Sequence, residues 1–284
     1  MQQEYVSLDG NRRLAYLSWG NPQSSETVIC VHGLTRNAHD FDVLSSTLCD
    51  KARIISIDVA GRGHSDWLED PEAYNYPTYC SDAKLLCQAL NIESAHWIGT
   101  SMGGLIGMFL AAENSGLIKT LVMNDVGPYI PLEALDRIKT YVGSDQTFVN
   151  IGAAVAYFKA TLSGFGQLTE TQWNNLAVHS LVPENGTYRL NYDPRIANNF
   201  STVSNDVSLW DVWKEVNCPA LVIRGSDSDL LTKETWHRMQ TGKPLVELIS
   251  FSNVGHAPAL LDDEQIHAVE RFIEEHFEKP QESH

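Results

Sequence analysis

The chain lacks long hydrophobic runs, a leader-like N-terminus and paired cysteine motifs. None of its 284 residues falls in an unbroken apolar run approaching the roughly 18 residues of a membrane-spanning helix. The first residues show no basic region followed by an apolar stretch, so we expect no signal peptide. Its five cysteines are widely spaced, without a Cys-x-x-Cys pair, which indicates neither a zinc knuckle nor a disulfide framework. These absences favour a cytoplasmic protein with reduced thiols.

Positive charge is also scarce. The chain has 20 Lys and Arg residues against 36 Asp and Glu, a formal net charge of −16. An acidic surface disfavours nucleic acids and anionic membranes as partners, and we expect neither. The hydrophobic content of 43% is enough for a large core.

Short apolar segments alternate with helical ones in both outer parts of the chain. We expect strands at 13–19, 27–31, 53–58, 94–99, 117–124, 219–224 and 246–251, and helices at 79–90, 233–241 and 263–276. This alternation is typical of an α/β fold with a mostly parallel central sheet covered by helices on both faces.

The middle of the chain has a different pattern. From about residue 128 to 213 it is helical and rich in aromatic residues, with no convincing buried strand. We therefore predict a core built from residues 1–127 and 214–284, with residues 128–213 inserted as a helical cap. Such a cap would lie over the carboxyl ends of the strands, where ligands bind in open α/β sheets.

The most informative motif is Gly99-Thr100-Ser101-Met102-Gly103, between an expected strand and a helix-compatible stretch. A strand, a sharp turn and a helix together form a nucleophile elbow, in which the two glycines let the backbones approach and expose Ser101. The backbone N–H of Met102 then points to where an oxyanion would form. A catalytic serine also needs a base, and the base needs an acid that orients it.

The expected base is His256, which Gly255 and Pro258 hold in a constrained turn after an apolar strand. The acid has three candidates. We prefer Asp229, in the loop between the strand ending at 224 and the helix starting near 233, over Asp227 in the same loop. Asp125, at the end of the neighbouring strand, would reach the same histidine.

The substrate pocket has less distinctive candidates. The turn His32-Gly33-Leu34 follows the first central strand and would supply the Leu34 N–H as a second oxyanion donor, with His32 bracing the turn. Arg36 would bind a substrate carboxylate. Phe165 and Trp173 in the cap would shape an apolar pocket.

Together these motifs resemble the α/β-hydrolase superfamily over nearly the whole chain. The matching segments are His32-Gly33, Asp58-Val59-Ala60-Gly61-Arg62-Gly63-His64-Ser65-Asp66, Gly99-Thr100-Ser101-Met102-Gly103-Gly104 and Gly255-His256. The order Ser101, Asp229, His256 is the nucleophile–acid–base order of that superfamily. Within it, the chain is similar to capped serine esterases, C–C bond hydrolases and lactonases. One departure is that relatives usually place the acid three residues after the strand-ending glycine, a position that Ser228 fills here.

The resemblance implies an enzyme that needs no metal and no cofactor. We expect a serine carboxylesterase acting on a small to medium acyl substrate, as a monomer or homodimer. A C–C bond hydrolase or lactonase using the same triad is an alternative, and so is a ligand-binding protein that keeps the fold without catalysis.

Overall fold

A computed structural model describes residues 1–8 and 12–278 and contains an eight-stranded central sheet. The spatial order of the strands is β1-β2-β4-β3-β5-β6-β12-β13. Their bounds are β1 Gln2–Ser7, β2 Arg13–Trp19, β3 Thr27–Val31, β4 Arg53–Ile57, β5 Ala95–Thr100, β6 Ile118–Asn124, β12 Ala220–Gly225 and β13 Val246–Phe251. Within this central sheet, the described pairings of β2 with β1 and with β4 are antiparallel and the other five are parallel. The predicted mostly parallel sheet is therefore confirmed.

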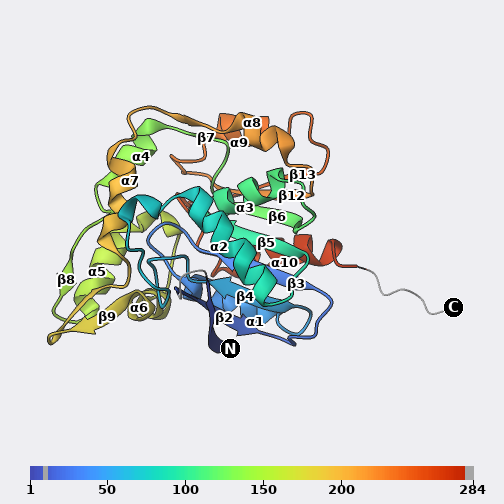
Figure 1. The fold of residues 1–284 in the computed structure, drawn as a ribbon. Coiled ribbons are helices and arrows are strands. Elements are labelled where there is room, and N and C mark those ends of the chain that lie inside the picture. Colours follow the sequence, from blue (N-terminus) through green and yellow to red (C-terminus); the bar gives the residue numbers. More distant parts are fainter. Residues whose placement is uncertain (9–11, 279–284) are drawn as a thin grey trace.

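Both faces of the sheet are covered by helices. Alternate residues of β3 face opposite ways, so Val28 and Cys30 join one core cluster and Ile29 and Val31 the other. The first cluster includes residues of α1 (Asp42–Leu48) and α10 (Asp263–Glu275). The second includes residues of α2 (Tyr76–Ala89), α3 (Met102–Ala112) and α9 (Lys233–Met239). Figure 1 shows α2 and α3 crossing the sheet on the near side.

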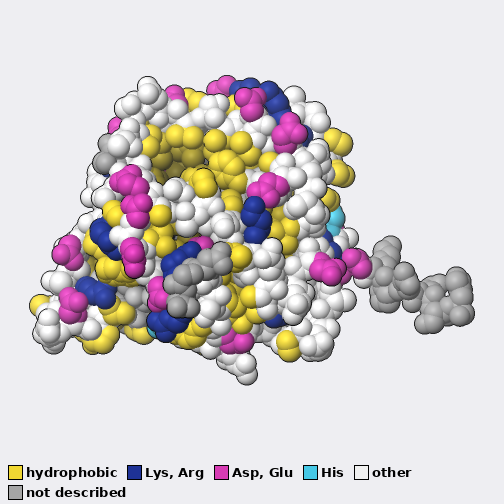
Figure 2. Space-filling view, viewed as in Figure 1, with side chains coloured by type: hydrophobic (Ala, Val, Ile, Leu, Met, Phe, Trp, Pro, Cys, Tyr) yellow, Lys and Arg dark blue, Asp and Glu magenta, His cyan; other side chains and the backbone are white. Residues whose placement is uncertain are grey.

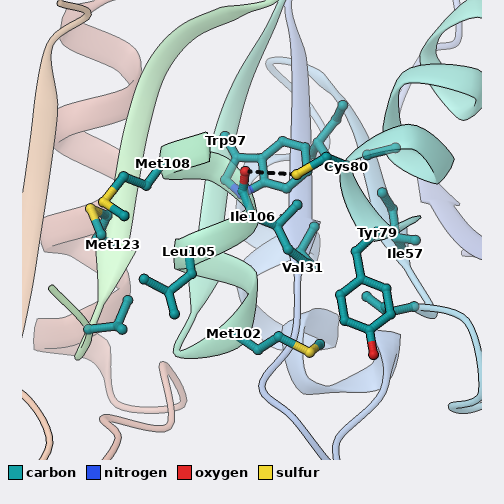
Figure 3. Close-up of a cluster of buried hydrophobic side chains, with 14 of the residues drawn as sticks. Val31, Ile57, Tyr79, Cys80, Trp97, Met102, Leu105, Ile106, Met108 and Met123 are labelled. Atoms are coloured by element: carbon teal, nitrogen blue, oxygen red, sulfur yellow. Dashed lines mark hydrogen bonds between the residues drawn. The ribbon is translucent and has the colours of Figure 1, made fainter. Parts of the chain in front are cut away.

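The second core cluster anchors the helix that follows the elbow. Figure 3 shows Met102, Leu105, Ile106 and Met108 of α3 packed among side chains of β3, β4, β5, β6 and α2. The indole of Trp97 in β5 is fully buried and donates a hydrogen bond to the carbonyl of Gly103, 2.9 Å away. This hydrogen bond connects strand β5, before the turn, to helix α3, after it.

Two local differences from the sequence prediction have clear causes. Helix α2 begins at Tyr76 rather than residue 79, because the Asn75 side chain caps it by accepting from the Thr78 N–H and Pro77 occupies its first turn. Strand β1 was not predicted, because almost all of its residues are exposed and it has no apolar alternation.

The segment 128–213, here called the cap segment, contains helices and short strands. Its helices are α4 Leu132–Lys139, α5 Ile151–Thr161, α6 Glu170–His179 and α7 Asn198–Ser201. Its strands are β7 Tyr129–Ile130, β8 Thr147–Phe148, β9 Leu181–Glu184, β10 Thr187–Leu190 and β11 Val207–Ser208, which form two small sheets. These strands are two to four residues long, too short for a periodic signal. Helix α8 (Trp210–Glu215) spans the expected boundary at 213 and packs on α3.

The described residues also include short 3₁₀ helices: η2 Ala38–Phe41, η3 Pro71–Ala73, η4 Ser163–Phe165 and η5 Pro194–Ala197. Figure 1 shows α4, α5, α6 and α7 gathered at one end of the sheet. On the face shown in Figure 2, hydrophobic side chains line a hollow, and charged side chains are scattered around it. Within the described residues, the helices are too short or too polar to cross a membrane.

Candidate active site

Ser101 lies at the sharp turn between β5 and α3. Its backbone has φ of 51° and ψ of −112°, a conformation that residues with a side chain rarely adopt. A Cβ atom on Gly99 would lie 2.2 Å from the Gly103 backbone, and one on Gly103 would lie 2.0 Å from the Val31 carbonyl oxygen. Glycine at both positions is therefore a steric requirement of the turn, as the motif predicted.

His256 lies in the loop that follows β13, opposite the serine. Its Nε2 is 3.0 Å from the Ser101 Oγ, so the hydrogen bond needed for proton transfer is already formed. Asn124, the last residue of β6, donates from its side chain to the Pro258 carbonyl at 2.8 Å and to the Thr100 hydroxyl at 3.1 Å. This amide therefore connects the histidine loop to the strand that carries the nucleophile.

The acid in contact with His256 is Asp125. Its Oδ2 is 2.8 Å from His256 Nδ1. A carboxylate only accepts hydrogen bonds, so Nδ1 carries the proton and Nε2 is left to accept from the serine hydroxyl. Asp125 is fully buried and also accepts from the Gly225 N–H at 2.8 Å and the Ser228 hydroxyl at 2.5 Å. Three donors hold this carboxylate in one orientation.

The preferred candidate Asp229 does not make this contact. Its carboxylate accepts two hydrogen bonds from Arg137 in the cap segment, at 2.5 and 2.8 Å, and its side chain is 46% exposed. Partial burial alone would raise the pKa of Asp229, but the bonds and charge of Arg137 lower it overall. Asp227 is also exposed and accepts from the Ser226 hydroxyl. The expected Asp229–His256 pair is therefore corrected to Asp125–His256.

The reason for the correction is the direction in which each loop leaves its strand. Asp125 directly follows β6 with φ of 54°, a tight left-handed turn that points its side chain back over the sheet edge. Ser228, at the position where relatives usually carry the acid, donates to Asp125 instead. A serine at that position was the available signal that the acid comes from another strand.

The Met102 and Leu34 N–H groups are the two predicted oxyanion donors. Each is oriented by hydrogen bonds that the carbonyl of the same peptide group accepts. The carbonyl of Ser101, which shares a peptide with the Met102 N–H, accepts from Gly104 and Leu105 in the first turn of α3. In a trans peptide the N–H points opposite to the C=O, so the Met102 N–H points away from the helix. A Cβ atom on Gly33 would lie 3.8 Å from the Ser101 Cβ, which places the second donor turn beside the nucleophile.

The turn that carries the Leu34 N–H is braced by a buried histidine and a buried arginine. His32 Nδ1 donates to the Gly33 carbonyl at 2.7 Å, while His32 Nε2 accepts from the Val59 N–H at 3.0 Å. Burial lowers the pKa of His32 to about 3, so the ring is neutral and suited to both roles. Arg62 donates to the Leu34 carbonyl at 2.9 Å. The turn is thus rigid before any substrate binds.

Arg36 does not present a free cation for a substrate carboxylate. Its guanidinium is 5% exposed, pairs with Asp40 at 2.6 Å and donates to the Ser180 hydroxyl of the cap segment, also at 2.6 Å. It also lies over the Phe158 ring of α5. The expected carboxylate-binding role is therefore replaced by a link between the core and the cap segment.

Several cavities border the loops that carry Ser101 and His256, and two of them bear on the predicted site. One of about 110 Å³ is lined by Thr100, Phe165 and Pro258, among others, and one of about 540 Å³ by His256, Gly255 and residues of α4 and α5. Phe165 thus lines a cavity as expected. Trp173 is buried in the cap segment and is not part of either lining.

Three side chains with metal-binding atoms, His39, Asp42 and His179, also come together at the smaller cavity. Their sequence spacing did not indicate a site, because the third residue lies 137 positions after the second.

Comparisons with known proteins show which family has this fold. Residues 26–263 match the model of the alpha/beta hydrolase fold family. The chain is 39% identical over 278 residues to a 3-hydroxybutyrate-oligomer hydrolase of Cupriavidus necator, covering 94% of this chain and 95% of the relative. It is 26% identical to a 2-(acetamidomethylene)succinate hydrolase of Mesorhizobium japonicum, covering 82% of each chain. A crystal structure of a putative hydrolase from Rickettsia typhi superposes with a TM-score of 0.92 at 35% identity, covering 97% of this chain and 99% of that one.

Proposed function

Starting from the fact that this chain belongs to the α/β-hydrolase family and is a serine hydrolase of that fold, we propose that it cleaves a carboxylic ester through Ser101, His256 and Asp125. The observation that carries the proposal is the unbroken chain of hydrogen bonds from the Ser101 hydroxyl through His256 to the buried Asp125. This is the arrangement that turns a weakly nucleophilic hydroxyl into an attacking group.

The proposed reaction has two halves. Ser101 Oγ attacks the ester carbonyl while His256 Nε2 takes its proton, and the same proton then passes to the leaving alkoxide. Asp125 stabilises the imidazolium that forms between these steps. Water, deprotonated by His256, attacks the resulting acyl-serine and releases the acid, while His256 returns the proton to Ser101 Oγ as the acyl–oxygen bond breaks. The N–H groups of Leu34 and Met102 stabilise the tetrahedral oxyanion in both halves, each by about 3–4 kcal/mol.

A short oligoester of a hydroxy acid is the substrate class that we favour. The relative from Cupriavidus necator is named for the hydrolysis of 3-hydroxybutyrate oligomers. Cavities of about 110 and 540 Å³ border the loops that carry Ser101 and His256, which leaves room for a small-molecule ester near the triad. The partner is thus a small-molecule ester, with no cofactor or nucleic acid in the reaction.

The domain division is part of the proposal. We assign residues 1–127 and 214–284 to a catalytic core, of which the structure describes 1–8, 12–127 and 214–278, and residues 128–213 to a cap that closes the substrate site. The contact between Gly164 of the cap segment and the His256 loop supports this division, because the Gly255 N–H donates to the Gly164 carbonyl at 2.8 Å.

The test is acid release by the purified protein from linear dimers and trimers of 3-hydroxybutyrate and from short-chain aryl esters. Ser101→Ala is expected to lower kcat by about 10⁴-fold or more. A fluorophosphonate probe should label Ser101 in the parent protein and not in the variant. Full activity of a folded Ser101→Ala protein would refute the mechanism. Absence of both labelling and turnover in the parent protein would favour the non-catalytic alternative.

The C–C hydrolase and lactonase alternatives are separated by the same assay. A dienoic diketo acid and a lactone join the panel, and faster turnover of either would replace the oligoester as substrate class while keeping the triad. No second function is preferred, since Arg36, the residue that suggested a carboxylate-bearing substrate, is paired with Asp40. Oligomeric state, monomer or homodimer, is read from light scattering of the same sample.

A further inference from the structure

A cluster of two histidines and one aspartate lies between the core and the cap segment. His39 belongs to η2 and Asp42 to the first turn of α1, while His179 is the last residue of α6. The imidazoles of His39 and His179 stack with centroids 3.7 Å apart, and His39 Nδ1 is 2.9 Å from Asp42 Oδ2. One potential ligand atom from each of the three residues lies within 4.8 Å of the other two.

From this cluster we propose a transition-metal site, with His39, Asp42 and His179 as ligands, that joins the cap segment to the core. Two imidazole nitrogens and one carboxylate oxygen are a donor set that suits Zn²⁺, Co²⁺, Ni²⁺ or Cu²⁺ rather than Ca²⁺ or Mg²⁺. In a tetrahedral zinc site, bonds of about 2.0–2.2 Å place the donor atoms about 3.4 Å from one another. The imidazoles of His39 and His179 are stacked in this structure, so metal binding requires one ring to rotate out of the stack and turn its nitrogen toward the other donor atoms.

A second observation points to a ligand at this place. The Oδ1 atom of Asp42 is buried and has no hydrogen-bond partner among the described residues. A buried carboxylate oxygen without a donor is costly, and a bound cation removes that cost.

The surroundings fit a cation with one open coordination position. The three side chains help to line the cavity of about 110 Å³, so a fourth ligand, water or an anion, has room. The nearby Arg36 is paired with Asp40, which leaves the Asp42 carboxylate as the net charge of the cluster. Asn37 also donates to the His179 carbonyl at 2.9 Å, so the third ligand is already held against the core.

The experiment uses the full-length protein after treatment with a chelator. Isothermal titration with ZnCl₂ is expected to show one saturable site, and Co²⁺ should give the visible absorption of a tetrahedral nitrogen–oxygen complex. His179→Ala and Asp42→Asn should each weaken zinc affinity at least tenfold. The matched control His237→Ala removes an exposed histidine of α9 and should change affinity less than twofold. Zinc should raise the Tm of the parent protein and of the control, but not of His179→Ala.

The readouts are binding and Tm, so they do not depend on the proposed ester hydrolysis. Circular dichroism without metal establishes that each variant is folded, and Asp42→Asn preserves the side-chain shape if His179→Ala proves unstable. Equal zinc affinity in the parent protein and both ligand variants would overturn the site. So would the lack of saturable binding by the parent protein at about 100 µM zinc, a concentration far above the dissociation constant that corresponds to a binding free energy of about 10 kcal/mol.

Discussion

Two loops at the same edge of the sheet carry aspartates, and the burial and hydrogen-bond partners of their carboxylates differ. The loop after β6 buries Asp125 completely and surrounds it with three hydrogen-bond donors. The loop after β12 leaves Asp229 46% exposed and paired with Arg137 of the cap segment. Both carboxylates lie near His256, but only the buried one is held in a fixed orientation toward it.

The difference shows what an orienting acid requires. The Asp229 carboxylate is exposed, so solvent screens its charge, and both of its oxygens accept from Arg137 rather than from His256. A buried carboxylate whose oxygens accept hydrogen bonds from several fixed donors is held in a single orientation. Ser228 in the β12 loop completes this arrangement by donating to Asp125, so the two loops together make one acid site.

The largest expected effect comes from changing the buried carboxylate. Asp125→Asn removes the acceptor that keeps the proton on His256 Nδ1, so the imidazole loses the tautomer that accepts from Ser101. We expect kcat for an ester to fall by about 10⁴-fold with little change in KM. Steady-state kinetics on the folded variant measure this loss.

The matched control is Asp229→Asn, which changes the exposed carboxylate in the same way. Loss of its pair with Arg137 should change kcat by less than about threefold. If Asp229→Asn were the more damaging of the two substitutions, the assignment of the acid to the β6 loop would be wrong.

A double variant tests whether a carboxylate in the β12 loop can orient His256 in place of Asp125. In Asp125→Asn with Ser228→Asp, a carboxylate returns at the position usual among relatives, next to the place that Asp125 Oδ2 occupied. We expect kcat to recover roughly 10- to 100-fold over Asp125→Asn alone, because the two sites share one hydrogen-bond network.

Ser228→Asp alone should instead lower the Tm, since it buries two carboxylates against each other. No recovery in a folded double variant would mean that the β12 loop no longer reaches His256, and that the two loops are not interchangeable.

A smaller effect is expected where the cap segment touches the histidine loop. A Cβ atom on Gly164 would lie 2.8 Å from the backbone carbonyl oxygen of His256 and 2.9 Å from the backbone nitrogen of His256. Gly164→Ala should therefore displace His256 and lower kcat roughly tenfold, with a smaller change in KM, because small misplacements of a catalytic group are costly. Rates measured at saturating ester reveal the effect.

Gly152→Ala provides the comparison for this variant. Gly152 lies in the first turn of α5, and an added Cβ would meet only the Asn150 side-chain oxygen, at 3.3 Å. It should leave kcat within about twofold, since surface substitutions of this kind have small effects. Equal losses in both variants would indicate a general loosening of the cap segment rather than a contact with His256.

Much of the core was predictable because its signals are local. The strands β2, β3 and β13 coincide with their expected ranges, since each is a short apolar run bounded by turn residues. The turn around Ser101 was predictable because the two glycines are required sterically by neighbouring backbone. The short strands of the cap segment were not predicted. Strand β8 pairs with β10 from a distant part of the chain, whereas β9 and β10 form a hairpin through Asn185 and Gly186, a local turn signal that was overlooked.

Local pattern thus identified the α/β fold, the sharp turn that carries Ser101 and the loop that carries His256, because glycine spacing and apolar periodicity act over a few residues. The choice among Asp125, Asp227 and Asp229 depended on how two loops leave neighbouring strands, and the hydrogen bond from Arg36 to Ser180 depended on where the cap segment folds back. His39, Asp42 and His179 likewise meet only in the folded chain. Directional contacts between distant segments are set by packing in three dimensions, and no spacing along the chain encodes them.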